Sequence, residues 1–249
     1  MEKDKRTRTE LLTEKVDRLI NWIKKKVRTA GKKGVIFGLS GGLDSAVLAV
    51  LCKRAFPDNT TALILPCESI ENDLLDAMQI INKYHINYQQ FDLTPLYRQI
   101  ISITNTQNLN NKMAKANIKP RLRMIVLYYF ASILDYLVVG ASNKSEISIG
   151  YFTKYGDGGV DILPLGNIIK SEIFEIARFL EIPENIISKL PSAGLWDNQT
   201  DEQEMGFSYE QLDTFLKYGT LRNKDIERVI LTMNRLSTHK RKRPPAPKI

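Results

Sequence analysis

The apolar residues of this chain follow two alternating patterns. Between Leu12 and Val27 they recur every three or four positions, which predicts an amphipathic helix that ends near Gly31. A short apolar run at residues 35–38 then predicts a buried strand. The alternation continues, and it predicts strands at 61–65, 87–91 and 137–140 and helices at 44–56, 71–84, 93–103 and 121–135.

Strands that alternate with helices of this length are typical of a parallel sheet, because a parallel pair needs a crossover of a dozen or more residues. Both faces of such a sheet are covered by the crossover helices. We therefore expect an α/β fold with a single doubly wound, mostly parallel sheet and helices on both faces.

The second half of the chain has fewer strand signals. Residues 104–115 are polar and rich in asparagine, which predicts a loop or the start of a short helix, and the glycines of residues 151–159 predict an exposed loop. Helical spacing returns at 170–180, 184–189, 208–217 and 223–236, whereas the basic, proline-containing tail at 237–249 should be extended. We expect one domain over residues 1–249, with its core at 10–243.

Composition narrows the protein class. The chain has 249 residues, 43% of them hydrophobic, which is enough for a core without disulfides and excludes a disordered chain. Its only cysteines are Cys52, which falls among apolar helix residues and so favours a packing role, and Cys67, whose role stays open. With only His85 and His239 beside them, they do not form a zinc-finger spacing.

Charge and hydropathy bear on the expected partners and compartment. The N-terminal residues carry alternating charges instead of the apolar stretch of a secretory signal, and Asp135 interrupts the longest apolar run, 124–139. We therefore expect a cytoplasmic protein with no membrane partner. The 36 Lys and Arg against 28 Asp and Glu give a net charge of +8, which suits nucleic acid and small polyanions such as nucleotides equally.

The strongest local signal lies between the first predicted strand and the helix that follows it. It reads Gly38, Leu39, Ser40, Gly41, Gly42, Leu43, Asp44 and Ser45. Adjacent glycines let backbone N–H groups approach a phosphate, the serines add hydroxyl donors, and the helix N-terminus favours an anion. A carboxylate in such a phosphate site makes electrostatic sense if Mg²⁺ lies between it and the phosphates, whereas the alternative is a glycine-rich turn in which Asp44 only caps its helix.

This loop resembles that of the pyrophosphatase-loop ATP enzymes, which cleave ATP between the α- and β-phosphates to adenylate a substrate. Further segments in the same order resemble the ammonia-dependent NAD synthetases, and the resemblance extends from about Lys15 to Arg243. These segments are 119–124, 140–146, 150–159 with Asp161, 191–196 and 200–202, of which Gly-Tyr-Phe-Thr-Lys-Tyr-Gly-Asp-Gly-Gly at 150–159 is the most specific. The resemblance implies an adenine nucleotide alpha hydrolase-like fold.

The resemblance also implies roles for individual residues. Asp44 and Glu146 would share Mg²⁺ and act as the catalytic carboxylates. ATP would be bound by the loop from Gly38 to Ser45 together with Ala141, Lys170 and Ser192, although position 141 is usually threonine in the family, so that a hydroxyl is missing there. The residues that would bind deamido-NAD are Arg121, Lys154, Asp161, His239 and Lys240.

The implied reaction is the ATP-dependent amidation of deamido-NAD by ammonia. ATP adenylates the nicotinate carboxylate and releases pyrophosphate, and ammonia then displaces AMP to give NAD. Glutamine-dependent relatives carry an additional glutaminase domain, for which 249 residues leave no room, so free ammonia or a separate donor is implied. Family members are homodimers, so we expect a homodimer that binds small molecules and no nucleic acid.

Two other functions stay open at this point. A tRNA-modifying ligase or thiolase would use the same loop, and the net charge favours it, but thiolases typically need a pair of reactive cysteines. A nonenzymatic nucleotide or nucleic-acid binding module would keep the loop without needing both Asp44 and Glu146. Finally, the polar segments 68–73 and 199–205 adjoin predicted element ends, and we expect them to be mobile lids.

Overall fold

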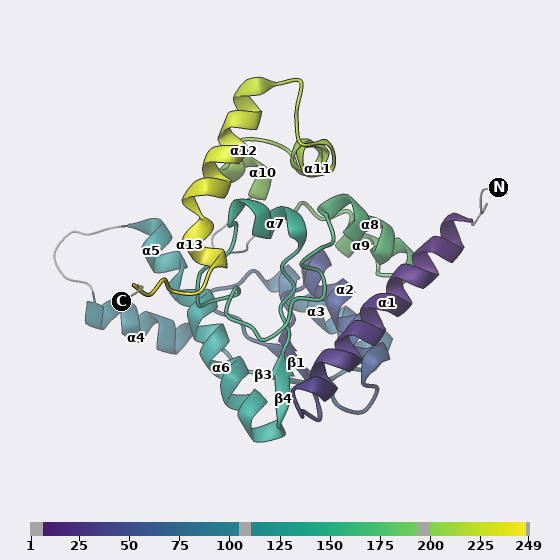
Figure 1. The fold of residues 1–249 in the computed structure, drawn as a ribbon. Helices are drawn as coiled ribbons and strands as arrows, with labels where there is room; N and C mark the ends of the chain where they lie inside the picture. Colours follow the sequence, from purple (N-terminus) through teal and green to yellow (C-terminus); the bar gives the residue numbers. More distant parts are fainter. Residues whose placement is uncertain (1–6, 105–110, 193, 195–199, 248–249) are drawn as a thin grey trace.

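The computed structural model describes residues 7–104, 111–192, 194 and 200–247, and Figure 1 shows their arrangement. The helices are α1 (Arg8–Thr29), α2 (Leu43–Ala55), α3 (Glu71–Tyr84), α4 (Thr94–Thr104), α5 (Lys112–Ala116), α6 (Ile118–Leu134), α7 (Lys144–Ile149), α8 (Lys170–Phe179), α9 (Glu184–Ile187), α10 (Asp201–Met205), α11 (Tyr209–Tyr218), α12 (Lys224–Leu236) and α13 (Thr238–Arg241). The strands are β1 (Gly34–Gly38), β2 (Thr60–Ile64), β3 (Asn87–Gln90) and β4 (Tyr136–Val138).

The strands form a parallel sheet in the order β3-β2-β1-β4. The chain runs outward from β1 to β3 and then crosses back to place β4 on the other side of β1, which confirms the predicted doubly wound topology. In such sheets the change of direction lies at the carboxyl ends of the strands between β1 and β4, where ligands bind. The loop from Gly38 to Ser45, which we call the phosphate-type loop, follows β1 at this edge.

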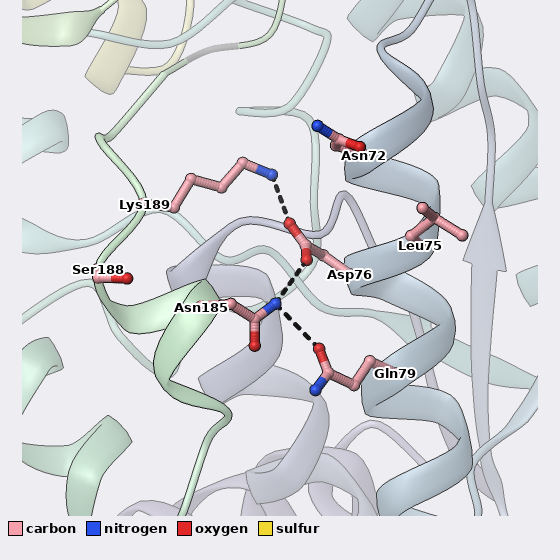
Figure 2. A pocket seen from close by; sticks show the side chains of 7 residues that line it. All are labelled: Asn72, Leu75, Asp76, Gln79, Asn185, Ser188 and Lys189. Atoms are coloured by element: carbon pink, nitrogen blue, oxygen red, sulfur yellow. Dashed lines mark hydrogen bonds and ion pairs between the residues drawn. The ribbon is translucent and has the colours of Figure 1, made fainter.

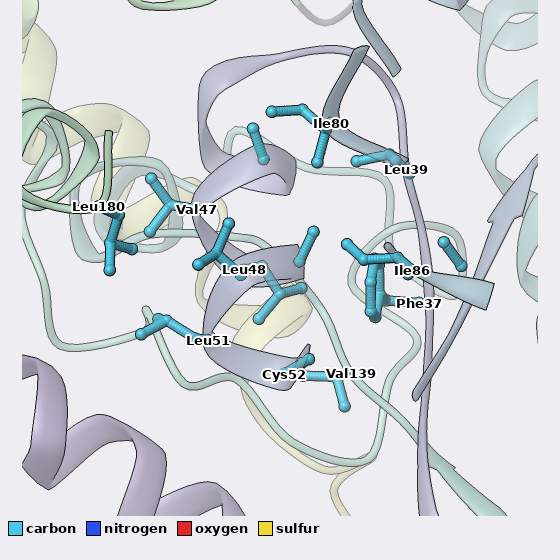
Figure 3. Packing of buried hydrophobic residues seen from close by; sticks show 14 of the residues in the cluster. Phe37, Leu39, Val47, Leu48, Leu51, Cys52, Ile80, Ile86, Val139 and Leu180 are labelled. Atoms are coloured by element: carbon cyan, nitrogen blue, oxygen red, sulfur yellow. The ribbon is translucent and has the colours of Figure 1, made fainter. Parts of the chain in front are cut away.

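Side chains alternate between the two faces of the sheet. Val35 and Phe37 of β1 join a core with α1, α2, α3 and α8, whereas Ile36 between them joins a second core with α4 and α6. Figure 3 shows the first of these cores: Val47 and Leu51 of α2 lie on the side of the helix toward Leu180, and Phe37 of β1 lies on its other side. Because α2 is apolar on all sides and buried, the loop at its N-terminus is held on a rigid element.

The C-terminal helices form a smaller group with its own apolar cluster. Residues of α7, α10, α11 and α12 make up this cluster, and in Figure 1 α10, α11 and α12 stand beyond α7, away from the sheet. We call α10–α12 the C-terminal helical group. Its contact with the α/β core runs through α7 and α8, the two helices that carry Glu146 and Lys170.

Several predicted boundaries differ from the structure. The first helix begins at Arg8 instead of Leu12, because Thr7 and Glu10 form a capping box there. The helix predicted from Arg121 begins at Ile118, since a proline is tolerated in a first turn, where its missing N–H would have no partner. The short helix α5 forms within the polar segment that was predicted as a loop or helix start.

Three short helices were not predicted. The helices α7 and α10 have only a turn or two, too short for a periodic apolar pattern. The tail was wrongly predicted to be extended at 238–241, where it forms α13, because Arg241 donates to Ser237 Oγ at 2.6 Å and to backbone carbonyls before it. None of the helices within the described ranges is long and apolar enough to cross a membrane.

Candidate active site

The loop after β1 folds as an open cradle. Ser40 Oγ and Ser45 Oγ lie 3.0 Å apart, Ser45 donates to the Gly42 carbonyl oxygen at 2.8 Å, and the Gly42 N–H donates to Ser40 Oγ at 3.3 Å. Gly42 is the N-cap of α2 and makes no side-chain cap bond, so the first N–H groups of this buried helix remain available to a ligand. Loop and helix N-terminus together fit a phosphate chain.

Gly41 is at the point where the loop meets α3. Its φ angle is +80°, and a Cβ atom there would lie 2.2 Å from the carbonyl oxygen of Asp73. The position therefore requires glycine for its backbone conformation and for its close contact with α3. This contact ties the phosphate-type loop to the first turn of α3.

Asp44, Glu146 and Lys170 come together beside this loop, which we call the carboxylate–lysine cluster. Lys170 Nζ forms an ion pair with Asp44 Oδ2 and lies 3.7 Å from Glu146 Oε1. The lysine is 2% exposed, so its charge is removed from solvent and balanced by the carboxylates. The structure thus brings together the two predicted catalytic carboxylates and one of the predicted ATP-binding residues.

The cluster changes the protonation of its members. Burial, and then repulsion from Asp44, raise the pKa of Glu146 to about 8, although Lys170 opposes this shift. Burial by itself lowers the pKa of Lys170, but the attraction of Asp44 and Glu146 outweighs it and the net shift is upward. Lys170 therefore stays charged at neutral pH, whereas Glu146 holds its proton more strongly than an exposed carboxyl does.

Asn143 connects the two carboxylates and was missed by the sequence analysis. Its Nδ2 donates to Asp44 Oδ1 at 3.0 Å, while its Oδ1 accepts from the N–H of Glu146 at 3.0 Å. Its own N–H donates to Glu146 Oε2 at 3.3 Å, which completes a capping box at the start of α7. The Asn-x-x-Glu spacing at 143–146 was the signal that could have revealed the helix start and the capping box between Asn143 and Glu146.

Tyr209 and Asp201 close the cluster from the C-terminal helical group. Tyr209 donates to Asp201 Oδ2 at 2.8 Å, its hydroxyl lies 3.4 Å from Glu146 Oε1, and its ring centre is 5.1 Å from Lys170 Nζ. Asp201 is buried, and among the described residues its Oδ1 has no hydrogen-bond partner. Burial raises the pKa of Asp201. Nothing in the local sequence around Tyr209 indicated that it reaches this site.

A second, cationic group surrounds the glycine-rich segment 150–159. Lys240 donates to the carbonyl oxygens of Gly150 and Phe152 at 2.8 and 2.9 Å, and Arg121 donates to the Lys154 carbonyl oxygen at 3.3 Å. Three of the residues predicted to bind deamido-NAD thus meet at one segment. His239 lies on the exposed side of α13 next to Lys240.

Asp161, the other predicted deamido-NAD residue, lies at the edge of β4. Its carboxylate accepts from the Val138 N–H at 2.8 Å and from the Tyr128 hydroxyl at 3.0 Å. It lines a cavity of about 550 Å³ together with Trp22 and Lys26 of α1. The carboxylate of Asp161 therefore holds the sheet edge, and the residue also belongs to the wall of this cavity.

The remaining predicted ATP residues lie outside the carboxylate–lysine cluster. Ala141 is half-buried against the main core just after β4. Ser192 is exposed, and its Oγ accepts from the Gly194 N–H at 3.1 Å. Of the two predicted lids, residues 201–205 form α10 with Asp201 buried, residue 199 lies outside the described residues, and the mobility of both lids stays a prediction.

A cavity of about 570 Å³ lies between α3 and α9 (Figure 2). Lys189 reaches across it to Asp73 and Asp76, each at 2.6 Å, and Asn185 donates to Asp76 at 2.8 Å. Asp73 belongs to the first turn of α3, which contacts Gly41. The ion pair of Lys189 with Asp73 therefore helps to hold this turn in place. The cavity itself contains none of the predicted site residues.

Comparisons with known proteins identify the family to which this chain is similar. The family model described as NAD synthase matches residues 15–244. The NH(3)-dependent NAD(+) synthetase of Carboxydothermus hydrogenoformans is 48% identical over 236 residues, 94% of this chain and 97% of that protein. The protein of the same name from Archaeoglobus fulgidus is 42% identical over 240 residues, 94% of this chain and 96% of that protein.

Two solved structures have the same fold. The structure of NMN synthetase from Francisella tularensis superposes with a TM-score of 0.91 at 38% identity, covering 96% of this chain and 99% of that one. NH3-dependent NAD synthetase from Campylobacter jejuni superposes with a TM-score of 0.80 at 30% identity, covering 95% and 99% of the two chains. The carboxylate–lysine cluster beside a phosphate-type loop, the family match and the near-complete coverage lead to one conclusion: the chain belongs to the NAD synthase family.

Proposed function

We propose that this chain amidates deamido-NAD with ammonia at the expense of ATP, forming NAD, AMP and pyrophosphate. It is a ligase that forms a C–N bond. The observation that carries this proposal is the carboxylate–lysine cluster of Asp44, Glu146 and Lys170 beside the open loop after β1. The cluster supplies charges of both signs where a triphosphate would be cleaved.

In the first step, a carboxylate oxygen of the substrate attacks the α-phosphorus of ATP. The bond between the α-phosphorus and the bridging oxygen breaks, and pyrophosphate leaves with that electron pair. The loop N–H groups and the hydroxyls of Ser40 and Ser45 lie where they can bind the departing phosphates. Lys170 is already charged and buried, so it can stabilise the negative charge that develops on the leaving group.

Asp44 and Glu146 have the donor chemistry that Mg²⁺ requires. They provide carboxylate oxygens close to one lysine, and the phosphates and water supply the further oxygen ligands of a typical Mg²⁺–ATP site. Within the described residues no group of three or more His, Cys, Asp and Glu side chains is placed to hold a metal ion. When bound, the ion would neutralise pyrophosphate charge.

The cationic group around segment 150–159 would bind the substrate's pyrophosphate. Arg121, Lys154 and Lys240 meet there, and His239 follows on the same turn as Lys240. The cavity lined by Trp22 and Asp161 would receive a nucleoside, because Trp22 offers an aromatic side chain in its wall. Ala141 and Ser192 remain proposed ATP contacts on the resemblance alone.

In the second step, ammonia adds to the acyl carbon of the adenylate. The bond between this carbon and the AMP oxygen breaks, AMP leaves with the electron pair, and the amide loses a proton to solvent. No side-chain nucleophile is needed, because the reactive intermediate is carried by the two substrates. Tyr209 and Asp201 restrict access of water to the carboxylate–lysine cluster from the side of the C-terminal helical group.

We further propose a cytoplasmic homodimer. Ile125, Tyr129 and Ile133 are 57%, 63% and 59% exposed and recur every four residues along α6, which supports burial of this stripe against a second copy of the chain. The free, buried cysteines support a reducing compartment. Light scattering of the wild type and of Tyr129→Glu tests the dimer, since a monomeric wild type would refute it.

A second candidate substrate is nicotinate mononucleotide. The superposition with NMN synthetase from Francisella tularensis favours it, and the adenylation and amidation chemistry would be the same. The dinucleotide differs by an added adenylate, for which the cavity at Trp22 and Asp161 provides space. We therefore favour deamido-NAD.

The test is chromatographic product analysis with ATP, Mg²⁺, ammonium and equal concentrations of both acid substrates. NAD and AMP should form in equal amounts. Omission of ATP, Mg²⁺, ammonium or deamido-NAD should abolish NAD formation, whereas omission of nicotinate mononucleotide should leave it unchanged. Asp44→Asn and Glu146→Gln should each lower turnover strongly. Formation of nicotinamide mononucleotide in preference to NAD would overturn the substrate assignment, and the absence of any amide product would overturn the proposed reaction.

A further inference from the structure

Asp213 is a buried carboxylate that neither the resemblance nor the proposed chemistry uses. It lies on α11 and is 3% exposed. Its Oδ1 accepts from the Ser145 hydroxyl at 2.5 Å, and its Oδ2 accepts from the Ser171 N–H at 2.7 Å. A carboxylate taken out of water in this way must be compensated by such donors, so both contacts are expected to be maintained.

The contacts of Asp213 serve the N-terminus of α8. The N-cap of this helix, Ile169, has no oxygen on its side chain, so it cannot bind the first N–H groups. Ser145 Oγ accepts from the Lys170 N–H at 3.0 Å, and Asp213 binds the next N–H, at Ser171. A carboxylate from another helix thus replaces the missing cap and is favourably placed at the positive end of the helix dipole.

These contacts also fix the start of α7. Ser145 precedes Glu146 directly and donates to Asp213 while it accepts from the Lys170 backbone. One carboxylate therefore holds the backbone that carries Lys170 and the residue next to Glu146. These are two of the three members of the carboxylate–lysine cluster, and their side chains are 3.7 Å apart at Lys170 Nζ and Glu146 Oε1.

Tyr209 lies one turn before Asp213 on the same helix. Its hydroxyl reaches Glu146 and Asp201, and its ring lies beside Lys170 Nζ. Residues four apart share a helix face, so α11 presents a tyrosine to the charged groups and an aspartate to the backbone behind them. One face of α11 therefore contacts the first turns of both α7 and α8 and holds them next to each other.

We propose that Asp213 is a positioning residue of the active site, which sets the placement of Lys170 relative to Glu146. This inference rests on the proposed function. Asp213 touches neither Lys170 Nζ nor the Glu146 carboxylate, so its effect on the reaction runs through Ser145 and the two helix starts. Substrate binding depends mainly on the loop after β1 and the cationic group, which Asp213 does not contact.

The test uses Asp213→Asn, Ser145→Ala and the double variant. Asparagine keeps the volume of Asp213, but its amide NH₂ group would face one of the two donors, the Ser145 hydroxyl or the Ser171 N–H, so that this hydrogen bond is lost. Ser145→Ala removes the hydrogen bond between Ser145 and Asp213 from the serine side. Each single substitution should lower kcat for NAD formation by about ten- to a hundredfold, because small displacements of catalytic groups have effects of this size. The KM for ATP should stay close to that of wild type. The double variant should lose no more than the worse single variant, because both changes break one path.

Glu227→Gln is the matched control. Glu227 accepts from the Leu221 N–H at 2.7 Å and from the Thr220 hydroxyl at 2.9 Å, the same donor types that Asp213 binds. It lies in the first turn of α12, and its two donors lie in the loop before that helix. The Glu227→Gln variant should lose thermal stability and keep the wild-type kcat. This result would separate an effect of Asp213 on the active site from the general effect of losing hydrogen bonds to a carboxylate.

A folded Asp213→Asn variant with the wild-type kcat would overturn the positioning role. The role would also be overturned if the reductions in kcat from Asp213→Asn and Ser145→Ala multiplied in the double variant, since the two changes would then act independently. Should Asp213→Asn fail to fold, a wild-type kcat in Ser145→Ala would overturn it equally. A wild type that forms no amide product would overturn the proposed function and this inference together, whereas an active wild type with an unaffected Asp213→Asn removes the inference alone.

Discussion

A methyl group added at Gly41 has no space in this fold. The Cβ atom of Gly41→Ala would lie 2.2 Å from the Asp73 carbonyl oxygen and 2.9 Å from its carbon, whereas real Cβ atoms essentially never approach closer than 3.0 Å. The loop after β1 and the first turn of α3 must therefore separate by at least about 0.8 Å. Both partners are backbone, so no side-chain rotation can relieve the contact.

The Gly41→Ala substitution should lower both the stability of the protein and its turnover. The left-handed backbone conformation at φ +80° costs an alanine about 1–2 kcal/mol in unfolding free energy. The displacement adds a loss of activity, because a shift approaching 1 Å in catalytic groups lowers turnover by as much as about a hundredfold. Gly219→Ala isolates the first cost, since its φ angle is +76° and nothing lies within 4 Å of the added atom.

Urea unfolding and steady-state NAD formation measure the two costs separately. Gly219→Ala should lose about 1–2 kcal/mol and keep the wild-type turnover. Gly41→Ala should lose more stability than Gly219→Ala and also lose at least about nine-tenths of its turnover. If the two variants behaved alike in both assays, the contact between Gly41 and Asp73 would have no bearing on loop placement, and the reasoning would be refuted.

Further predictions concern Glu146, the thiols and Lys189. Because the pKa of Glu146 is raised from 4.5 to about 8, the native protein binds more protons than the unfolded chain between these values, so thermal stability in chelator should fall as pH rises through this window. Glu146→Gln should flatten that fall, and an unchanged slope would contradict the assignment. Cys52 and Cys67 should resist a thiol reagent until the protein unfolds, because both are fully buried and burial raises the pKa of each thiol. A fast-reacting thiol in the native protein would refute this. Lys189→Met should lower the unfolding free energy by no more than about 1 kcal/mol, and the loss should shrink in high salt, since the ion pairs with Asp73 and Asp76 are partly exposed.

The sheet and the phosphate-type loop could be predicted because their signals are local. The strand β1 needs only a short apolar run, and the glycines after Gly38 mark the turn into α2 wherever the rest of the chain lies. Helix starts were predicted less accurately. At Thr7 the capping box moves the start of α1 outward, before the first residue of its apolar pattern.

The contacts that complete the site could not be predicted in the same way. Asp44 and Lys170 are 126 positions apart, and Ser145 and Asp213 are 68 apart. No spacing rule connects such pairs, because the contact depends on how α7, α8 and α11 pack together. The resemblance supplied Glu146 and Lys170, whereas Tyr209, Asp213 and the bond from Asn143 to Asp44 became visible only in the folded chain.

The charged groups of the site are arranged at a cost to stability. Asp44, Glu146 and Asp201 lie around one buried lysine, and burial raises the pKa of Glu146 and of Asp201. A fold selected for stability alone would replace such a cluster with apolar side chains, since buried ion pairs seldom repay their desolvation. Its presence beside an open helix N-terminus is explained if a polyanionic substrate and its counterion complete the charge balance. Nucleotide binding should therefore stabilise this protein most strongly at the junction of α2, α7 and α8, where these buried charges lie.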